Sequence, residues 1–170
     1  MNLFLRLLLL LLTAWARPRC GALGPSRKRF LVWPPDLDVL GHVNNGVYLS
    51  MLDVARVDLL LRSGIAPILR RKRWYPVVAA QTIRFRRSLQ LFQRFDVETT
   101  VIGWDDKAIL IQHHFLRGSE LVAEAVVRSR FLKRQGGTVP SRELLDAIGQ
   151  SGRGPELPAW VAAWNLQNAR

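Results

Sequence analysis

The sequence predicts an α+β fold in which one long helix packs against an antiparallel sheet. A short strand-like run precedes a long apolar helix-like run, and four further strand-like runs then follow one another with only short turns between them. Strands joined without intervening helices are antiparallel neighbours, because a parallel connection needs a crossover of a dozen or more residues. The 170 residues, 49% of them hydrophobic, suffice for one domain with an extension at each end.

The first strand and the helix have recognisable boundaries. The strand is expected over residues 29–33, where a Pro-Pro pair stops it because proline cannot donate to a ladder. The helix is expected over residues 46–62, where apolar residues recur near helical spacing. Asn44 or Asn45 suits its N-cap, and Gly64 suits its C-terminal stop. Few polar positions interrupt the helix, so we expect the sheet to wrap around it.

The later strands are indicated by apolar alternation between turn-forming residues. Turns are expected at residues 104–106 and 117–119, which contain Asp, Gly and Ser. Residues 67–73 are expected to form a basic connector after the helix. The four strands are expected over residues 75–86, 94–103, 107–117 and 120–133.

We expect three parts along the chain: a hydrophobic N-terminal segment with a basic linker (1–26), a single domain (27–135) and a helical C-terminal extension (136–170). Within the extension, Ser141 is the expected N-cap of a short helix. The short helix, a flexible joint and a terminal amphipathic piece are expected over residues 141–148, 149–154 and 158–168.

Residues 3–16 form an apolar run interrupted only by Arg6. The run is shorter than the roughly 20 residues that span a bilayer as a helix. We favour a membrane-contacting helix with the domain on the cytoplasmic side, because basic residues follow the run. Two alternatives stay open: Ala14-Trp15-Ala16 resembles a signal-peptide cleavage site, which would give an exported form, and the helix could pack on its own domain.

The composition limits the classes of partner and site. A formal charge of +12 suggests an anionic partner, such as nucleic acid, a lipid surface or a phosphorylated small molecule. No recognisable nucleic-acid motif accompanies the basic runs, so we expect no nucleic-acid partner. The single Cys20 excludes an internal disulfide framework and fits a reducing compartment. The three histidines lack the spacing of a zinc site, and we expect neither a metal nor a cofactor.

The most informative motif lies between the first strand and the helix. Residues 36–45 read Asp-Leu-Asp-Val-Leu-Gly-His-Val-Asn-Asn, which crowds two carboxylates, an imidazole and two amides against a helix N-terminus. An acid and a histidine placed there can supply a general base or a nucleophile. The unpaired N–H groups of the first helical turn can stabilise an oxyanion. The motif therefore predicts a catalytic loop.

Several shorter runs accompany the motif: Tyr48-Leu49, Asp53-Val54-Ala55-Arg56, Arg87-Ser88-Leu89 and Gly103-Trp104-Asp105-Asp106-Lys107-Ala108. With these runs, the chain resembles the hotdog-fold acyl-CoA thioesterases over residues 27–134. Within them it is similar to the 4-hydroxybenzoyl-CoA thioesterase branch, and in particular to the thioesterase superfamily member six type. The resemblance implies a long central helix wrapped by a five-stranded antiparallel sheet. It also implies a homodimer or tetramer with active sites at the subunit interface, acting on an acyl-CoA or, less so, an acyl-ACP.

The resemblance assigns roles to members of the motif. Asp38 corresponds to the aspartate that attacks the thioester carbonyl or activates water, although it could instead cap the loop or pair with Arg29. The backbone N–H of Asn45 corresponds to the oxyanion donor. His42 is the candidate auxiliary polariser, with orientation of Asp38 or bonding of loop carbonyls as alternatives. Leu40 stands where plant acyl-ACP thioesterases carry a catalytic Asn, so their mechanism is not implied.

Three further residues are candidates for substrate binding. Asp53 matches an acidic helix position in part of the family, and an ion pair with a nearby arginine is the alternative. Arg84 and Arg86 lie two residues apart on one predicted strand, where they could grip the phosphates of CoA. Arg128 with Arg130 forms a second pair of the same kind.

The sequence thus predicts an acyl-CoA thioesterase. A noncatalytic hotdog protein that binds acyl ligands or an anionic membrane surface is the alternative, supported by Leu40 and by the hydrophobic N-terminus. We expect a cytoplasmic protein in membrane contact through residues 3–16, with an exported form as the alternative.

Overall fold

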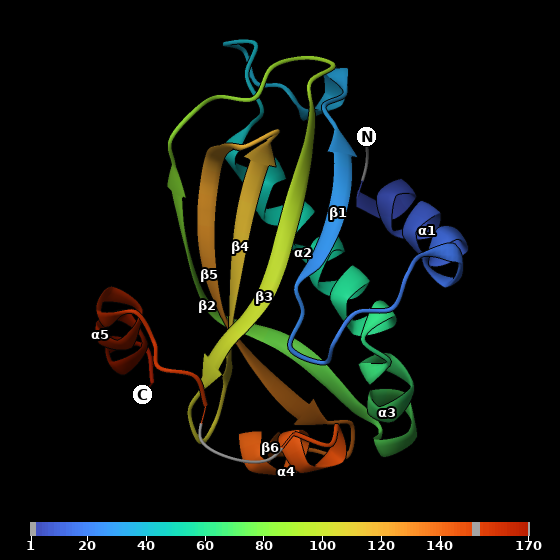
Figure 1. Cartoon of the computed structure of the whole chain (residues 1–170), viewed down its shortest axis with the longest axis vertical. Helices are drawn as coiled ribbons and strands as arrows, with labels where there is room; N and C mark the ends of the chain where they lie inside the picture. The colour runs from blue at the N-terminus through green and yellow to red at the C-terminus, as the bar shows by residue number, and fades with distance from the viewer. Residues whose placement is uncertain (1–2, 151–153, 170) are drawn as a thin grey trace.

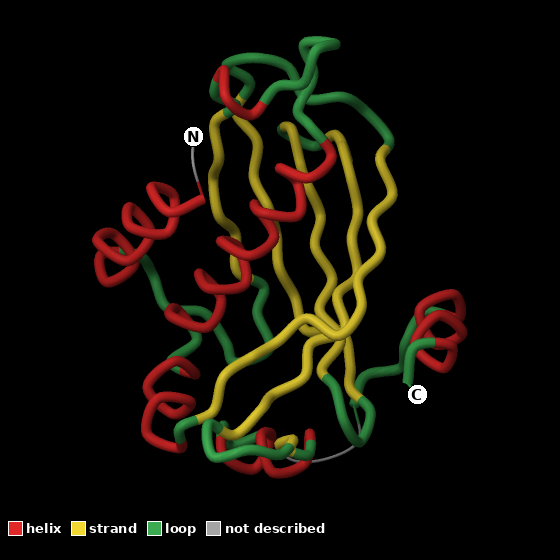
Figure 2. Tube along the Cα trace, turned by 180° about the vertical axis from the view of Figure 1, so that it is seen from behind, coloured by secondary structure: helices red, strands yellow, loops and turns green. Residues whose placement is uncertain are grey.

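The computed structural model describes residues 3–150 and 154–169, and it places one long helix against a curled antiparallel sheet (Figure 1). Figure 2 shows this helix lying over one face of the sheet. The helix is α2, Asn45–Arg62, and the main strands are β1 Ser26–Leu31, β2 Trp74–Phe85, β3 Arg94–Trp104, β4 Ile109–Arg117 and β5 Glu120–Lys133. The predicted strands are confirmed, although the first begins and ends earlier than residues 29–33.

The strand order is β1-β3-β4-β5-β2, and every neighbouring pair is antiparallel. A two-residue strand that the sequence did not indicate, β6 (Thr138–Val139), adds to β5. Because β2 pairs only with β5 among the described strands, it forms an edge of the sheet. Tyr75, Val78 and Phe85 are exposed along this edge. An apolar edge strand of this kind is a ready template for pairing with another chain.

The boundaries of α2 follow from capping. The Gly46 N–H donates to Oδ1 of Asn44 at 2.8 Å, so Asn44 is the N-cap. Gly64 adopts a left-handed conformation with φ of 77° just beyond the last turn, as predicted. The sheet covers α2, and the fully buried core they share includes Met51, Leu52, Ala55, Phe115, Ala125 and Val127.

The prediction of a connector over residues 67–73 is wrong, because a helix, α3 (Ile65–Lys72), occupies this segment. Pro67 is its third residue, where the missing N–H costs no intrahelical bond. Ile65 and Leu69 are buried one turn apart, and three basic residues complete the last turn. Burial of this apolar stripe and cations at the helix C-terminus stabilise a helix that its length alone would not predict.

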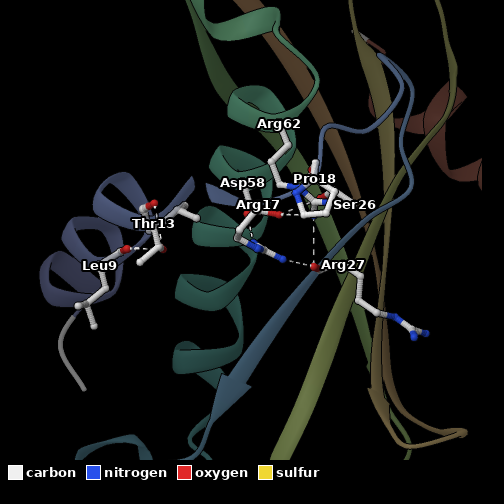
Figure 3. A network of polar contacts seen from close by, with 9 residues as sticks. Leu9, Thr13, Arg17, Pro18, Ser26, Arg27, Asp58 and Arg62 are labelled. Carbon is white, nitrogen blue, oxygen red and sulfur yellow. Dashed lines mark hydrogen bonds and ion pairs between the residues drawn. The ribbon is translucent and has the colours of Figure 1, made fainter. Parts of the chain in front are cut away.

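The N-terminal run forms α1 (Leu3–Thr13) and the 3₁₀ turn η1 (Ala14–Ala16). One face of α1 packs beside α2, with Arg6 and Leu10 buried. The chain is then fastened by an ion pair between Arg17 and Asp58 of α2 (Figure 3). This packing agrees with the interpretation in which the helix of residues 3–16 packs on its own domain. Among the described residues, no helix combines the length and apolar character needed to cross a membrane.

The C-terminal extension contains α4 (Ser141–Ala147) and α5 (Ala159–Gln167). Pro140 is the N-cap of α4, and the expected cap Ser141 is instead its first residue. The expected joint at residues 149–154 lies partly outside the described residues. Arg128 is buried and donates to Asn165 of α5 at 2.9 Å and to Asp105 at 2.7 Å. Arg128 is therefore committed to holding α5 and is not free to bind a phosphate.

Candidate active site

The motif loop folds as a tight hairpin that leads into α2. The Asp38 N–H donates to the His42 carbonyl at 2.8 Å, and the Gly41 N–H donates to the Asp38 carbonyl at 3.1 Å. Gly41 has a φ of 76°, which favours glycine at this turn. The Val43 N–H donates to the Leu89 carbonyl at 2.9 Å, which pins the loop to the segment after β2. The geometry of the loop is thus set largely by its backbone.

Asp36 closes the base of the loop and is only 1% exposed. Its Oδ2 accepts the Trp33 N–H at 2.8 Å, and its carbonyl accepts the Asn44 N–H at 2.9 Å. The same Oδ2 lies 2.5 Å from Nη2 of Arg6 in α1. These contacts give Asp36 a structural role at the base of the loop.

Asp38 is half-buried at the turn of the loop. Its Oδ1 accepts the N–H of Leu40 at 2.9 Å and that of His42 at 3.3 Å. The alternative ion pair between Asp38 and Arg29 is absent within the described residues, because Arg29 pairs with Asp96 at 3.2 Å. One carboxylate oxygen therefore caps the loop, which fixes the orientation of the side chain beside the cavity described next.

A cavity of about 560 Å³ opens between the motif loop, the start of α2 and the end of β2. We call it the loop-side cavity. It brings together the three predicted catalytic residues and one of the two arginines predicted to bind phosphate, Arg86, which directly follows β2. Its lining is Asp38, Leu40, His42, Val43, Asn45, Tyr48, Phe85, Arg86, Arg87 and Ser88.

The loop-side cavity combines groups with complementary chemistry. Asn45 is the first residue of α2, so its N–H has no intrahelical partner and lies at the positive end of the helix dipole. The Asp38 carboxylate can act as base or nucleophile, and the imidazole of His42 can donate a proton or a hydrogen bond. Arg86 and Arg87 add positive charge at the rim. This arrangement can bind an anion and stabilise an oxyanion next to a carboxylate.

Two predicted substrate-binding residues lie elsewhere. Asp53 is eight residues beyond Asn45, about 12 Å along the helix, and pairs with Arg56. Arg84 places its guanidinium 6.0 Å from the ring of Trp160 in α5. The structure therefore does not bring Arg84 and Arg86 together in the loop-side cavity.

Sequence reasoning did not single out Tyr48, Phe85 and Arg87 as site residues. Tyr48 is buried under the cavity, its ring centroid 5.0 Å from that of Phe85, and burial raises the pKa of its phenol. Arg87 is exposed and lies 3.5 Å from Glu120. The run Arg87-Ser88-Leu89 was a visible signal. Its proximity to the motif depends on the long-range bond between Val43 and Leu89.

A second cavity of about 210 Å³ lies farther along α2, beside the start of β2, and we call it the helix-side cavity. Most of its lining is aliphatic, and its charged groups are the pair Asp53 and Arg56. The lining is Asp53, Arg56, Val57, Leu59, Leu60, Pro76, Val77, Val78, Ile111, Ser129 and Phe131.

Buried polar groups accompany the helix-side cavity. Burial lowers the pKa of the Arg56 guanidinium, and the adjacent Asp53 opposes this shift. His113 is fully buried on the sheet face under α2, and its Nδ1 lies 3.0 Å from Oγ1 of Thr99. Burial, and then the positive charges of Arg56 and His114, hold the pKa of His113 well below its ordinary value of 6.5. His113 is therefore a neutral core residue.

Comparison with known proteins identifies the family. Residues 32–165 match the Thioesterase-like superfamily, and the chain belongs to it. Protein THEM6 of Xenopus laevis is 34% identical over 138 residues, which cover 81% of this chain and 66% of that protein. The chain thus spans just under two thirds of the length of this relative.

Solved structures resemble the fold closely. The probable thioesterase YbaW of Escherichia coli is 22% identical with a TM-score of 0.67, over 72% of this chain and 95% of that one. The gentisyl-coenzyme A thioesterase BH1999 is 20% identical with a TM-score of 0.64, over 71% of this chain and 99% of that one. The predicted hotdog fold is confirmed.

Proposed function

We propose that the chain is an acyl-CoA thioesterase that hydrolyses its substrate to a free acid and CoA. The observation that carries this proposal is the loop-side cavity, where a carboxylate, an imidazole, a helix N-terminus and arginines converge. Membership of the Thioesterase-like superfamily supports thioester hydrolysis. The similar fold of a protein described as a gentisyl-coenzyme A thioesterase supports a CoA thioester as the substrate class.

In the proposed reaction, the thioester carbonyl lies at the N-terminus of α2 and accepts a hydrogen bond from the Asn45 N–H. Asp38 either attacks the carbonyl carbon or takes a proton from water that attacks it. The oxyanion is stabilised by the helix N-terminus. The C–S bond then breaks, and the CoA thiolate leaves, with His42 as the proposed polariser. With Asp38 as nucleophile, water hydrolyses the resulting anhydride and releases the acid.

Arg86 and Arg87 are the proposed phosphate-binding residues for CoA. Each forms a long ion pair with an acid, Arg86 at 3.6 Å from Glu124 and Arg87 at 3.5 Å from Glu120. Such exposed pairs are weak, so a phosphate can replace them. Arg84, which lies at Trp160, is not required by this arrangement.

We also propose a homodimer formed by pairing of two β2 edges. The exposed apolar residues Tyr75, Val78 and Phe85 on this edge support it. Two-fold symmetry would make the pairing antiparallel and isologous. A tetramer could be built by further contacts between such dimers.

A screen of acyl-CoAs of increasing chain length, including aromatic acyl groups, tests the activity by detection of released thiol. The wild-type protein should turn over at least one class, and Asp38→Ala should abolish turnover while keeping the fold and oligomeric state. Wild-type rates in Asp38→Ala on every substrate would show that Asp38 is neither the nucleophile nor the general base. No turnover by the wild-type protein on any thioester would reject the activity itself.

The second candidate function is noncatalytic binding of acyl ligands or an anionic membrane surface. It is favoured by the exposed apolar residues of α1 and η1, which are Phe4, Leu5, Leu8, Leu9, Leu11, Leu12 and Trp15. Amphipathic binding of this kind adds apolar burial to attraction for anionic lipid. Sedimentation with phosphatidylserine-containing vesicles tests it, and Leu8→Ser/Leu12→Ser should weaken the binding. Retention of full binding by this variant would exclude α1 as the contact.

A further inference from the structure

We propose that Arg6 is a positioning residue for the motif loop, because its buried ion pair with Asp36 holds the Asp38 carboxylate in place relative to the N-terminus of α2. This inference rests on the proposed thioesterase activity. It assigns a role in that activity to α1, which lies outside the loop-side cavity.

The orientation of α1 is the first observation. Its single charged residue, Arg6, is 5% exposed, whereas Leu8, Leu11 and Leu12 are 52%, 57% and 61% exposed. Burial of a guanidinium is costly unless it is paired, and an apolar residue would dock a leucine-rich helix at lower cost. Docking of α1 therefore does not by itself explain an arginine at this position.

The contacts of Arg6 are the second observation. Its Nη2 lies 2.5 Å from Oδ2 of Asp36 and 3.4 Å from the carbonyl of Leu31, the last residue of β1. Its guanidinium carbon lies 5.8 Å from the ring centroid of Phe30. Arg6 thus links α1 to the end of β1 and to the first acid of the motif, which lies 30 residues away in sequence.

The position of Asp36 is the third observation. Its side chain accepts the Trp33 N–H before the loop, and its carbonyl accepts the Asn44 N–H after it. Asn44 is also the N-cap of α2. Asp36 therefore closes the two ends of the loop onto each other, with Asp38 two residues away and the proposed oxyanion donor Asn45 directly after Asn44.

The consequence is a specific kinetic effect. Loss of the pair would allow Asp38 to move relative to the Asn45 N–H, and small displacements of reacting groups are expensive in rate. Arg86 and Arg87 lie on the segment after β2 and would stay in place. Turnover should therefore fall more than substrate binding.

A pair of double variants in the full chain separates positioning from stability. Arg6→Met/Asp36→Asn removes both charges while Asn keeps an acceptor for the Trp33 N–H. The matched control is Arg17→Met/Asp58→Asn, because Arg17 also fastens the N-terminal segment to a fully buried acid of α2 (Figure 3). Asp58 lies in the last turns of α2, remote from the motif loop.

Arg6→Met/Asp36→Asn should lower kcat at least 10-fold and change KM less than 3-fold. The control should stay within 2-fold of the wild-type kcat, even where its melting temperature falls as far as that of Arg6→Met/Asp36→Asn. Equal losses of kcat in the two variants, or a wild-type kcat in Arg6→Met/Asp36→Asn, would overturn the proposal. If the double variant fails to fold, Arg6→Lys against Arg17→Lys serves instead, and only Arg6→Lys should lower kcat.

A second measurement does not depend on activity. Hydrogen exchange should accelerate across residues 36–44 in Arg6→Met/Asp36→Asn and not in the control. Unchanged exchange in the loop would overturn the positioning role. Faster loop exchange in a protein whose wild type hydrolyses no thioester would reject the proposed function and leave the structural link between α1 and the loop standing.

Discussion

The loop-side and helix-side cavities differ in the properties that a thioesterase must combine. The loop-side cavity is larger, about 560 Å³, and holds an acid, an imidazole and two arginines. The helix-side cavity is about 210 Å³ and mostly aliphatic, with one ion pair at its edge. The first is suited to the thioester and the phosphates, and the second to an apolar acyl group. Under the proposed function, chemistry and acyl recognition are thus divided between two places in one chain.

The distance between the cavities is a second argument for the proposed dimer. They lie at opposite ends of β2, since Val78 borders one and Phe85 borders the other. Seven residues of strand separate these positions, about 23 Å. An antiparallel pairing of two β2 edges would bring the start of one β2 toward the end of the other. A complete site would then take its loop-side cavity from one copy and its helix-side cavity from the other.

The largest expected effect distinguishes the acids of the two cavities. Asp38→Asn should lower kcat about 1,000-fold, because an amide is neither a general base nor a carboxylate nucleophile. Asp53→Asn should lower kcat/KM less than 10-fold, since Asp53 is half-exposed and pairs with Arg56. Steady-state kinetics on the best acyl-CoA measures both. A larger loss in Asp53→Asn would place the chemistry at the helix-side cavity.

Mixed dimers test whether the site is shared between copies. Asp38→Ala removes the acid, and Val77→Trp should fill the helix-side cavity, so each homodimer should be inactive. Random mixing makes half of the dimers heterodimers, and each of these has one intact site if the cavities come from different copies. Activity should recover to about a quarter of the wild-type value. Absence of recovery, with heterodimers verified by mass spectrometry, would show that both cavities serve the same chain.

The contrast between the cavities also shows what the sequence can predict. The loop-side cavity follows from a contiguous motif, in which Asp38, His42 and Asn45 lie within eight residues and next to a helix start. The strands followed from period-two alternation, which is a local property. The helix-side cavity draws its lining from α2, β2, β4 and β5, so only the tertiary packing defines it.

The features that the sequence did not reveal also depend on tertiary packing. Arg6 looked like an interruption of an apolar run, because its partner Asp36 lies 30 residues away. Arg84 and Arg86 looked equivalent on one strand, but β2 ends at Phe85, so only Arg84 belongs to the strand. The helix α3 was missed because its stability depends on the burial of Ile65 and Leu69. Long-range packing decided each case.

Changes at Val77 should alter substrate selectivity in opposite directions. Val77→Phe reduces the helix-side cavity and should lower kcat/KM for the longest accepted acyl group about 10-fold relative to the shortest. Val77→Ala enlarges the cavity and should favour longer groups. Ratios of kcat/KM across a chain-length series measure the shift. A uniform loss on all substrates in both variants would mean that this cavity does not hold the acyl group.

The smallest expected effect is the contribution of His113, in the core beneath α2, to the pH dependence of the free energy of unfolding. The pKa of His113 is held well below 6.5 in the folded chain, so below pH 6.5 the unfolded chain binds a proton that the folded chain does not. The free energy of unfolding should therefore fall with decreasing pH, with a contribution of up to about 1.4 kcal/mol per pH unit. Urea unfolding at pH 7.5, 6.5 and 5.5 measures this slope.

The neighbouring histidine provides the control for this slope. His114 lies on the opposite strand face, half-exposed and 3.5 Å from Glu124. His113→Phe should flatten the pH dependence between 6.5 and 5.5, whatever its effect on stability at pH 7.5, and His114→Phe should preserve it. An unchanged slope in His113→Phe would locate the titrating group elsewhere. A flattened slope would tie acid sensitivity of the fold to the core beneath α2, separately from any pH dependence of turnover at the loop-side cavity.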